Sequence, residues 1–192
     1  MLGSGSKVCV RNGKPADAKA LSRIFKEAWQ LAYRGIIPHL HLESMIRQRT
    51  PEWWRDALKS GDGTLVLEMA GTVAGYATIG SARQRSPYQG EIYELYLDPI
   101  YQGLGLGEHL FEGCRHALDM RKLNGLIVWA LLDNTAACDF YWRRGGRPIT
   151  STFAAPDGSS TSRGGIDFAM ASETASFDTD DLRANVDKFL KK

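Results

Sequence analysis

The spacing of apolar residues predicts that the first third of the chain is mainly helical. Residues 15–34 carry apolar side chains at intervals of three and four, which indicates one helical face, and Gly35 ends the pattern. A second helical region covers residues 42–46. Thr50 and Pro51 then restart the helix as its cap and first residue. We therefore expect two or three helices before the main strands.

Runs of β-branched, aliphatic and aromatic residues predict the strands. Residues 64–70 and 72–79 read as two strands of a hairpin that turns at Ala70-Gly71, and residues 91–97 form the strongest strand pattern in the chain. Further strands are expected at residues 8–10, 126–132, 148–153 and 166–171, the last two around a Gly/Ser-rich loop.

The remaining helices alternate with these strands. One helix opens after the segment Gly103–Gly107, a second is capped by Asp133-Asn134, and a third covers the tail from Asp178 to Lys192. This order predicts an α+β (mixed α/β) fold with one strand–helix–strand crossover. We expect a mixed, mostly antiparallel sheet of six to seven strands, flanked by about four helices and followed by a C-terminal helix.

Composition changes this picture little but excludes several classes. The 192 residues are 43% hydrophobic and 24% charged, values typical of one globular domain. The net charge of +2 is too small for a dedicated nucleic-acid binder, and no apolar run reaches the length of a membrane span. Three cysteines without a C-x-x-C motif suggest a reducing, cytoplasmic location and no zinc site. Residues 1–7 read as a flexible leader or a cloning remnant.

The glycine-rich segment between a strand and a helix is the main candidate binding motif. Glycines let a backbone approach a ligand closely, and the N–H groups at a helix start attract anions. A dinucleotide fingerprint fails because Glu108 takes the place of its third glycine, and a P-loop fails because Gly107 is not followed by Lys-Ser/Thr. A glycine-rich turn without a ligand is the remaining structural alternative.

The pattern that does fit is Gln102-x-x-Gly105-x-Gly107, within "YELYLDPIYQGLGLGEHLF". Here the chain resembles the GNAT superfamily of acyl-CoA-dependent N-acyltransferases. The resemblance implies that backbone amides of this loop hold the pyrophosphate of coenzyme A, and that an amide near Leu97 binds the thioester oxygen. The implied coenzyme A-binding residues are Leu95, Tyr96, Leu97, Gln102, Gly103, Leu104, Gly105, Leu106 and Gly107.

A second segment, Asn134 to Tyr141 followed by Gly145-Gly146, also resembles the family. It implies that Asn134, Ala137 and Phe140 contribute to coenzyme A binding, with Ala137 leaving room for the pantetheine arm. Tyr141 would offer its hydroxyl to the departing sulfur. The structural alternatives are that Asn134 is only a helix cap and that Tyr141 is only a core aromatic residue.

Acetyl transfer to an amine requires a base and an acid. An alkylamine has a pKa of about 10.4, so most of it is protonated at neutral pH, and a carboxylate can remove a proton directly or through water. The resemblance implies Glu91 as the first candidate, because many family members carry a base-like glutamate at this distance from the glycine loop. Glu94 lies nearer the acyl end, and water alone is the third possibility. Strand alternation puts Glu91 and Glu94 on opposite faces. Tyr141 would act as the general acid, and Cys138 leaves a covalent route formally open.

The sequence therefore predicts an enzyme that transfers the acetyl group of acetyl-CoA to a primary amine of a small molecule or peptide, directly in a ternary complex. The alternative is a non-catalytic coenzyme A-binding module of the same fold. The domain should cover residues 8–171, and residues 172–192 should form an extension. The resemblance to the family also suggests a homodimer. No metal site is expected. The segment "AWQLAYRGIIP" resembles the acceptor-site helix of the family, which implies an acceptor-binding role for Trp29 and Tyr33. Tyr93 is a further aromatic candidate for the acceptor site, and core packing is the alternative role of all three residues.

Overall fold

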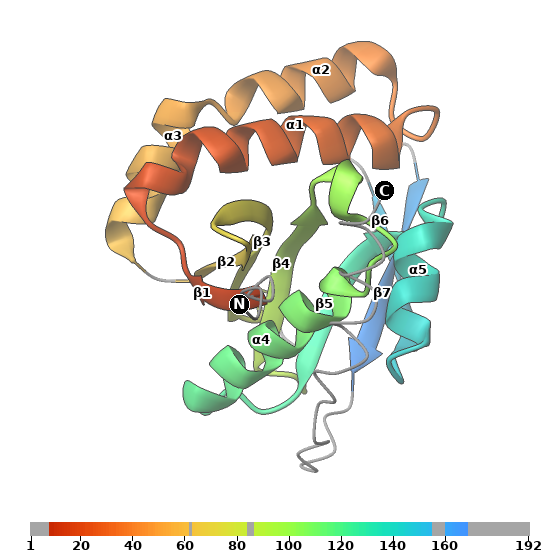
Figure 1. Ribbon diagram of the computed structural model, residues 1–192. Helices are drawn as coiled ribbons and strands as arrows, with labels where there is room; N and C mark the ends of the chain where they lie inside the picture. The colour runs from red at the N-terminus through yellow and green to blue at the C-terminus, as the bar shows by residue number, and fades with distance from the viewer. Residues whose placement is uncertain (1–7, 62, 84–86, 155–159, 169–192) are drawn as a thin grey trace. The chain divides into compact units, whose positions relative to one another are not determined.

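The computed structural model describes residues 8–61, 63–83, 87–154 and 160–168 (Figure 1). The chain divides into two compact units. Among the described residues, the first unit contains residues 8–61, 63–78 and 94–114, and the second contains residues 79–83, 87–93, 115–154 and 160–168. The division crosses two strands and one helix, so the chain passes between the units several times.

The first unit begins with three antiparallel strands. Strand β1 (Val8–Asn12) pairs with β2 (Thr64–Met69), and β2 pairs with β3 (Thr72–Ser81). The turn between β2 and β3 has two consecutive residues with positive φ, Ala70 at 51° and Gly71 at 80°. This geometry matches the twist of a two-residue hairpin, so the predicted hairpin is confirmed.

Three helices of the first unit lie together (Figure 1). After a 3₁₀ turn, η1 (Pro15–Asp17), the chain forms α1 (Ala18–Tyr33), α2 (His39–Gln48) and α3 (Pro51–Ala57), and then the 3₁₀ turn η2 (Leu58–Ser60). The predicted cap is present, because Thr50 Oγ1 accepts the Trp53 N–H at 3.2 Å. The helices and strands share a core of Ala18, Leu21, Ile24, Phe25, Trp54, Leu58, Val66 and Tyr76.

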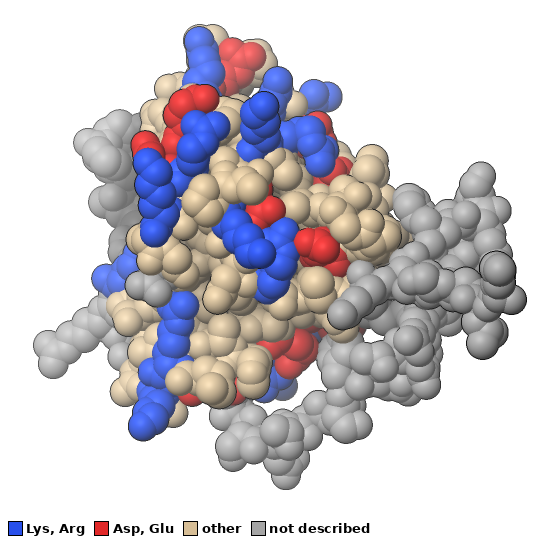
Figure 2. Space-filling model, turned by 60° about the vertical axis from the view of Figure 1, so that its left-hand side comes forward, with Lys and Arg blue, Asp and Glu red and all other residues tan. Residues whose placement is uncertain are grey.

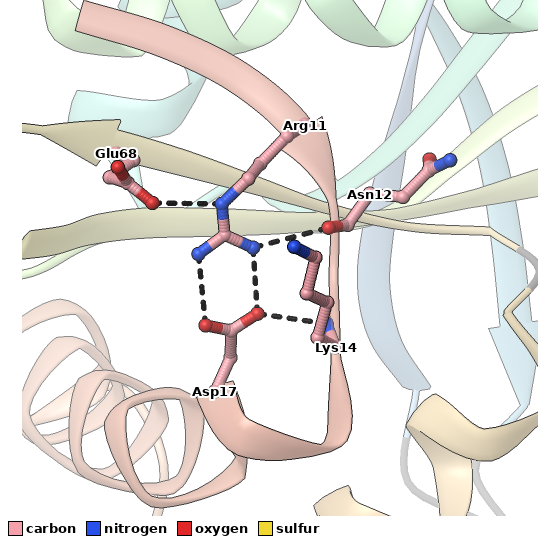
Figure 3. A network of polar contacts seen from close by, with 5 residues as sticks. All are labelled: Arg11, Asn12, Lys14, Asp17 and Glu68. Atoms are coloured by element: carbon pink, nitrogen blue, oxygen red, sulfur yellow. Dashed lines mark hydrogen bonds and ion pairs between the residues drawn. The ribbon is translucent and has the colours of Figure 1, made fainter. Parts of the chain in front are cut away.

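A charged network attaches the start of the helical layer to the strands (Figure 3). The Arg11 guanidinium on β1 donates to both carboxylate oxygens of Asp17, at 2.8 and 3.0 Å, and to Glu68 on β2 at 2.8 Å. Asp17 also accepts the Lys14 N–H at 2.8 Å. The guanidinium hydrogen bonds lower the pKa of Asp17 below its ordinary value of 3.8. The network therefore fixes the position of η1 relative to β1 and β2.

The chain then enters β4 (Gly90–Leu97), the 3₁₀ turn η3 (Pro99–Tyr101) and α4 (Leu106–Met120). The division between units falls within β4, so that Gly90–Tyr93 belong to the second unit and Glu94–Leu97 to the first. In the first unit β3 and β4 approach closely at Gly75. A Cβ atom there would lie 2.8 Å from the Tyr96 carbonyl oxygen and would collide with the Leu97 side chain.

The second unit contains β5 (Leu126–Leu131), α5 (Thr135–Trp142), β6 (Arg147–Ala154) and β7 (Ser160–Phe168). The start of β4 pairs with β5 in parallel, which confirms the predicted crossover, and β7 pairs antiparallel with both β5 and β6. The hydrogen-bonding order of the strands is β1-β2-β3-β4-β5-β7-β6. The mixed α/β class is therefore confirmed, and four of the five strand pairings with a described register are antiparallel.

Two sequence predictions need correction within the described residues. The last strand was expected at residues 166–171, but it starts at Ser160, because pairing with β6, and from Arg163 on with β5 as well, outweighs the weak strand propensity of its Gly/Ser-rich first half. The described residues form five α-helices where about four were expected, since α2 and α3 are separate. The predicted leader (1–7), the extension (172–192) and its helix lie outside the described residues.

Candidate active site

The glycine loop has the backbone geometry of a ligand-binding turn. Gly103 and Gly105 have φ values of 78° and 80°, in the left-handed region that favours glycine. Nothing lies within 4 Å of the position a Gly103 Cβ atom would take, and Gly103 and Gly105 are both exposed. The α-helix begins immediately afterwards at Leu106. The first N–H groups of an α-helix have no partner inside the helix, so those of Leu106 and Gly107 are suited to an anion.

Helix α4 is held firmly beneath this loop. Its first residue, Leu106, is fully buried, as are Leu110 and Cys114 further along. Gly113 lets the helix approach β1, since a Cβ atom there would lie 2.8 Å from Val10 Cγ1. Close packing of this kind fixes the helix axis, and therefore the direction of its N-terminal amides.

Strand β4 leads into the loop, and its pairing with β5 ends at Ile92. The β4–β5 register runs from Gly90–Leu126 to Ile92–Val128 and stops there, whereas β4 continues to Leu97. Leu95, Tyr96 and Leu97 are partly buried. At the end of the strand the Gln102 side-chain amide donates to the Leu97 carbonyl oxygen at 3.4 Å. Gln102 thus has a structural contact that the motif alone did not reveal.

Glu94 lies in the first unit within a polar contact set surrounded by aromatic rings. Its carboxylate accepts from Arg49 Nη2 at 2.7 Å and from the Tyr76 hydroxyl at 3.0 Å. The guanidinium carbon of Arg49 lies 4.0 Å from the centre of the Trp53 ring. The Glu94 side chain remains 11% exposed. Burial, followed by the charge of Glu94, raises the pKa of Tyr76 well above its ordinary value, so this hydroxyl stays a donor.

Glu91 lies in the second unit and is fully buried. Both of its carboxylate oxygens accept hydrogen bonds from Arg83: Oε2 from the backbone N–H at 2.7 Å, and Oε1 from the side-chain Nε at 2.9 Å. The same guanidinium lies over the Tyr93 ring, with 4.4 Å between its carbon and the ring centre. Glu91 therefore holds Arg83, two residues beyond the end of β3.

The second motif forms helix α5 in the second unit. Asn134 caps it, because its Oδ1 accepts the Ala137 N–H at 3.2 Å. Tyr141 is 6% exposed and its ring contacts that of Phe140, with 5.1 Å between the ring centres. Gly145, with a φ of 83°, ends the helix. The structural role predicted as an alternative for Asn134 is therefore confirmed, and it does not conflict with a role in binding.

The candidate acceptor residues fall in different units. Trp29 and Tyr33 lie on α1 in the first unit, where the Tyr33 and Tyr96 hydroxyl groups are 3.2 Å apart. Tyr93 lies in the second unit, and its hydroxyl donates to the Ser81 carbonyl oxygen at 2.7 Å. A groove of about 450 Å³ lies in the first unit, where α1 ends and α2 begins. Its lining includes Gln30, Arg34, Ile36, Ile37, Leu42 and Ile46.

Sequence reasoning missed the partners of the two glutamates. Arg49 lies 45 residues from Glu94 in the chain, and Tyr76 lies 18 residues from it. No local spacing signal connects such positions. Arg83 lies eight residues from Glu91, and the structure pairs the two.

Charge and metal-binding groups add little to this site. On the face shown in Figure 2, lysine and arginine side chains are interspersed with aspartate and glutamate, in line with the net charge of +2. Among the described residues there is no group of three or more His, Cys, Asp or Glu placed to hold a metal ion. The described helices include none long and apolar enough to cross a membrane.

Known proteins are similar to this chain in sequence or in fold. The chain is 29% identical over 129 residues to the uncharacterised N-acetyltransferase YuaI of Bacillus subtilis, an alignment covering 66% of this chain and 73% of YuaI. It is 34% identical over 71 residues to the N-alpha-acetyltransferase RimI of Mycobacterium tuberculosis, covering 37% of this chain and 43% of RimI. The PaiA N-acetyltransferase of Thermoplasma acidophilum, solved in complex with coenzyme A, superposes with a TM-score of 0.63 at 18% identity, covering 84% and 99% of the two chains.

At 18% identity the likeness to PaiA shows the fold alone. The model of the acetyltransferase (GNAT) family matches residues 19–145, about two thirds of the chain, and that span includes the glycine loop, both β4 glutamates and Tyr141. The chain belongs to the acetyltransferase (GNAT) family, the acyl-CoA-dependent N-acyltransferases.

Proposed function

We propose that this enzyme transfers the acetyl group of acetyl-CoA to a primary amine by direct attack in a ternary complex. The glycine loop between β4 and α4 is the observation that carries the proposal. It combines two left-handed glycines with the N-terminal amides of a buried helix, an arrangement suited to the pyrophosphate of coenzyme A. Coenzyme A in the PaiA structure supports the same class of donor.

In the proposed reaction the neutral amine attacks the thioester carbonyl carbon. A C–N bond forms, the carbonyl electrons move onto oxygen, and an amide N–H of β4 beyond Ile92 stabilises that oxyanion. The amine proton passes to a base. The C–S bond then breaks, and the sulfur takes a proton from the Tyr141 hydroxyl, which is replenished from solvent.

The identity of the base depends on which glutamate the amine or a water molecule can reach. Glu91 is fully buried, and both of its oxygens accept from Arg83. Glu94 also accepts at both oxygens, from Arg49 and from Tyr76, but its side chain is 11% exposed. This exposure favours Glu94, reached directly or through water, with Glu91 as the alternative that the resemblance to the family favours.

Direct transfer is favoured over a covalent acetyl-cysteine. Burial, followed by the charge of Asp139, raises the pKa of the Cys138 thiol. Its sulfur lies 3.7 Å from the Leu131 carbonyl oxygen, a weak contact in which the thiol is the donor. A protonated, half-buried thiol is a poor nucleophile.

The groove at the α1–α2 junction is the proposed acceptor side. It lies within the segment that resembles the acceptor helix of the family, and it combines apolar side chains with Arg34 and Glu43 at its edge. A small molecule or a short peptide segment fits a groove of this size. The cytoplasmic location and the homodimer predicted from the sequence stay predictions.

Two matched glycine variants test the donor site. Gly103 and Gly61 both have left-handed φ values, 78° and 69°, and both have open space at the Cβ position. Replacing either by alanine costs about 1 kcal/mol of folding stability, because the left-handed conformation is unfavourable for a residue with a Cβ. We expect only Gly103→Ala to weaken acetyl-CoA binding, by about tenfold, measured by isothermal titration calorimetry.

Equal acetyl-CoA affinity in wild type, Gly103→Ala and Gly61→Ala would contradict the donor site. Binding without amine-dependent thiol release would instead support the non-catalytic coenzyme A-binding module. An initial-velocity pattern of intersecting lines is expected for a ternary complex, whereas parallel lines would indicate a covalent intermediate.

A further inference from the structure

A buried carboxylate stands at the entrance to the glycine loop. Asp98 directly follows β4, and Gln102, the first residue of the loop motif, is four positions further on. The Asp98 side chain is 0% exposed. A carboxylate held away from water is costly unless hydrogen bonds and a positive charge compensate it. The groups that bind Asp98 therefore show how its buried charge is compensated.

Asp98 connects three elements of the first unit. Its Oδ2 accepts from Arg23 Nη1 on α1 at 2.6 Å, and its Oδ1 accepts the Ile100 N–H of η3 at 3.1 Å. Its backbone N–H donates to the Ala74 carbonyl oxygen of β3 at 2.9 Å, and its carbonyl oxygen accepts the Tyr101 N–H at the same distance. The 3₁₀ turn, yellow-green in Figure 1, contacts α1.

The turn determines where the glycine loop begins. The Gln102 N–H donates to the Pro99 carbonyl oxygen at 3.3 Å, and the loop glycines follow at once. An oxyanion or phosphate site depends on amides that are already in position before the ligand arrives. Loss of the Asp98 contacts would leave those amides free to reorient.

The positive charge that compensates Asp98 comes from Arg23, whose side chain is half-exposed. Its side chain is 46% exposed, and it also contacts Glu27 one turn along α1 at 3.1 Å. The contact with Glu27 is an exposed pair of the kind that contributes little to stability, whereas the contact with Asp98 compensates a buried charge. A variant of Glu27 can therefore serve as a control for the loss of the Arg23–Asp98 contact.

We propose that Arg23 is a positioning residue for the donor: by holding Asp98 and η3, it keeps the glycine-loop amides in the arrangement that binds the pyrophosphate of acetyl-CoA. This role of Arg23 in donor binding rests on the acetyl-CoA site proposed above. The same residue connects the loop to α1, the helix that carries Trp29 and Tyr33.

The first test is hydrogen–deuterium exchange of the full chain without ligand. We expect Arg23→Met to increase the exchange rate of amides 100–107 by at least tenfold relative to wild type, with little change in β1 and β2. Glu27→Gln should leave these amides unchanged. Arg23→Lys should restore most of the protection, because an ammonium group still compensates the Asp98 charge.

The second test is binding and turnover. Arg23→Met should raise the Kd and KM for acetyl-CoA by about tenfold, while kcat at saturating acetyl-CoA and the KM of the amine stay within about twofold. If Arg23→Met proves too unstable to purify, Asp98→Asn takes its place, since asparagine keeps the acceptor for the Ile100 N–H without the buried charge.

The outcomes separate this inference from the proposed function. Faster exchange of the loop in a protein whose wild type does not bind acetyl-CoA would refute the proposed donor site and retain the Arg23–Asp98 connection. Unchanged loop exchange in Arg23→Met, or a fall in kcat with an unchanged KM for acetyl-CoA, would overturn the positioning role.

Discussion

The two halves of β4 carry the same residue type in different surroundings. Glu91, in the half that belongs to the second unit, is fully enclosed and bound at both oxygens by one arginine of a neighbouring loop. Glu94, in the half that belongs to the first unit, is bound by Arg49 and by the hydroxyl of Tyr76, and its side chain stays partly exposed. Both carboxylates are hydrogen-bonded at both oxygens, but three positions along the strand separate one that is fully buried from one that is 11% exposed.

This difference shows why distance from a motif is not enough to assign a catalytic base. A base needs a lone pair that the substrate proton can reach, either directly or through one water molecule. The spacing from the glycine loop, read through the resemblance to the family, favours Glu91, but the partial exposure of the Glu94 side chain favours Glu94. We therefore expect substitution of Glu94 to lower the rate of acetyl transfer, and substitution of Glu91 to lower the stability of the folded protein.

The largest effect should come from Glu94→Gln. An amide cannot accept the amine proton, so kcat/KM at neutral pH should fall by about a thousandfold, within the usual range for a general base. Glu91→Gln, the same change three residues away, is the matched control and should lose less than about tenfold. The opposite ranking in steady-state kinetics would identify Glu91 as the base.

Tyr141→Phe is expected to have the next largest effect. The variant keeps the buried ring and its contact with Phe140 but removes the proton for the departing sulfur. We predict a fall in kcat of about a hundredfold with an almost unchanged KM for acetyl-CoA. A better leaving thiol in the donor should rescue the variant; equal losses with good and poor leaving thiols would show that Tyr141 is only a core residue.

Glu91→Gln should reveal its effect in denaturation. The substitution removes the charge that accepts the Arg83 hydrogen bonds, and bonds to a charged group contribute about 1.5–3 kcal/mol each before solvent screening of the half-exposed arginine. We expect the free energy of unfolding to fall by about 2 kcal/mol in urea titrations. Glu94→Gln should destabilise by a similar amount or less, so a much larger loss for Glu94→Gln would contradict the division of roles.

The smallest effect should come from an ion pair away from β4. Arg11→Met should lower the free energy of unfolding by about 1 kcal/mol at neutral pH, since the Arg11 side chain is partly exposed. Arg11 lowers the pKa of Asp17 in the folded state. The stabilisation that this ion pair gives the folded protein is therefore complete above the ordinary pKa of 3.8, and it is lost as the pH falls through the lower, folded-state pKa. Wild type and variant should therefore converge in stability below about pH 4, whereas a constant difference would exclude Asp17 as the titrating partner.

The sequence predicted most elements well because they depend on local signals. The Ala70-Gly71 hairpin, the Thr50 cap and the glycine loop each follow from two or three neighbouring residues. The predicted start of β7 was wrong because residues 160–165 have little strand propensity. They form a strand only through pairing with β6, joined from Arg163 on by pairing with β5.

The same distinction applies to the candidate site. The motif residues were found from their spacing, whereas Arg23, Arg49 and Arg83 were not assigned to their carboxylates. Each lies between 8 and 75 positions from its partner, and no periodic pattern connects them. Ion pairs between distant elements arise from the tertiary fold, so a single sequence carries almost no signal for them.

Amine-dependent release of the coenzyme A thiol from acetyl-CoA tests the central claim most directly. Purified full-length protein would be incubated with acetyl-CoA and a panel of amino acids, small alkylamines, aminoglycosides and short peptides, and free thiol would be followed against time. At least one primary amine should accelerate thiol release, and Glu94→Gln should abolish that acceleration while still binding acetyl-CoA. Failure of every amine to accelerate thiol release, in a protein that also shows no affinity for acetyl-CoA, would contradict the account.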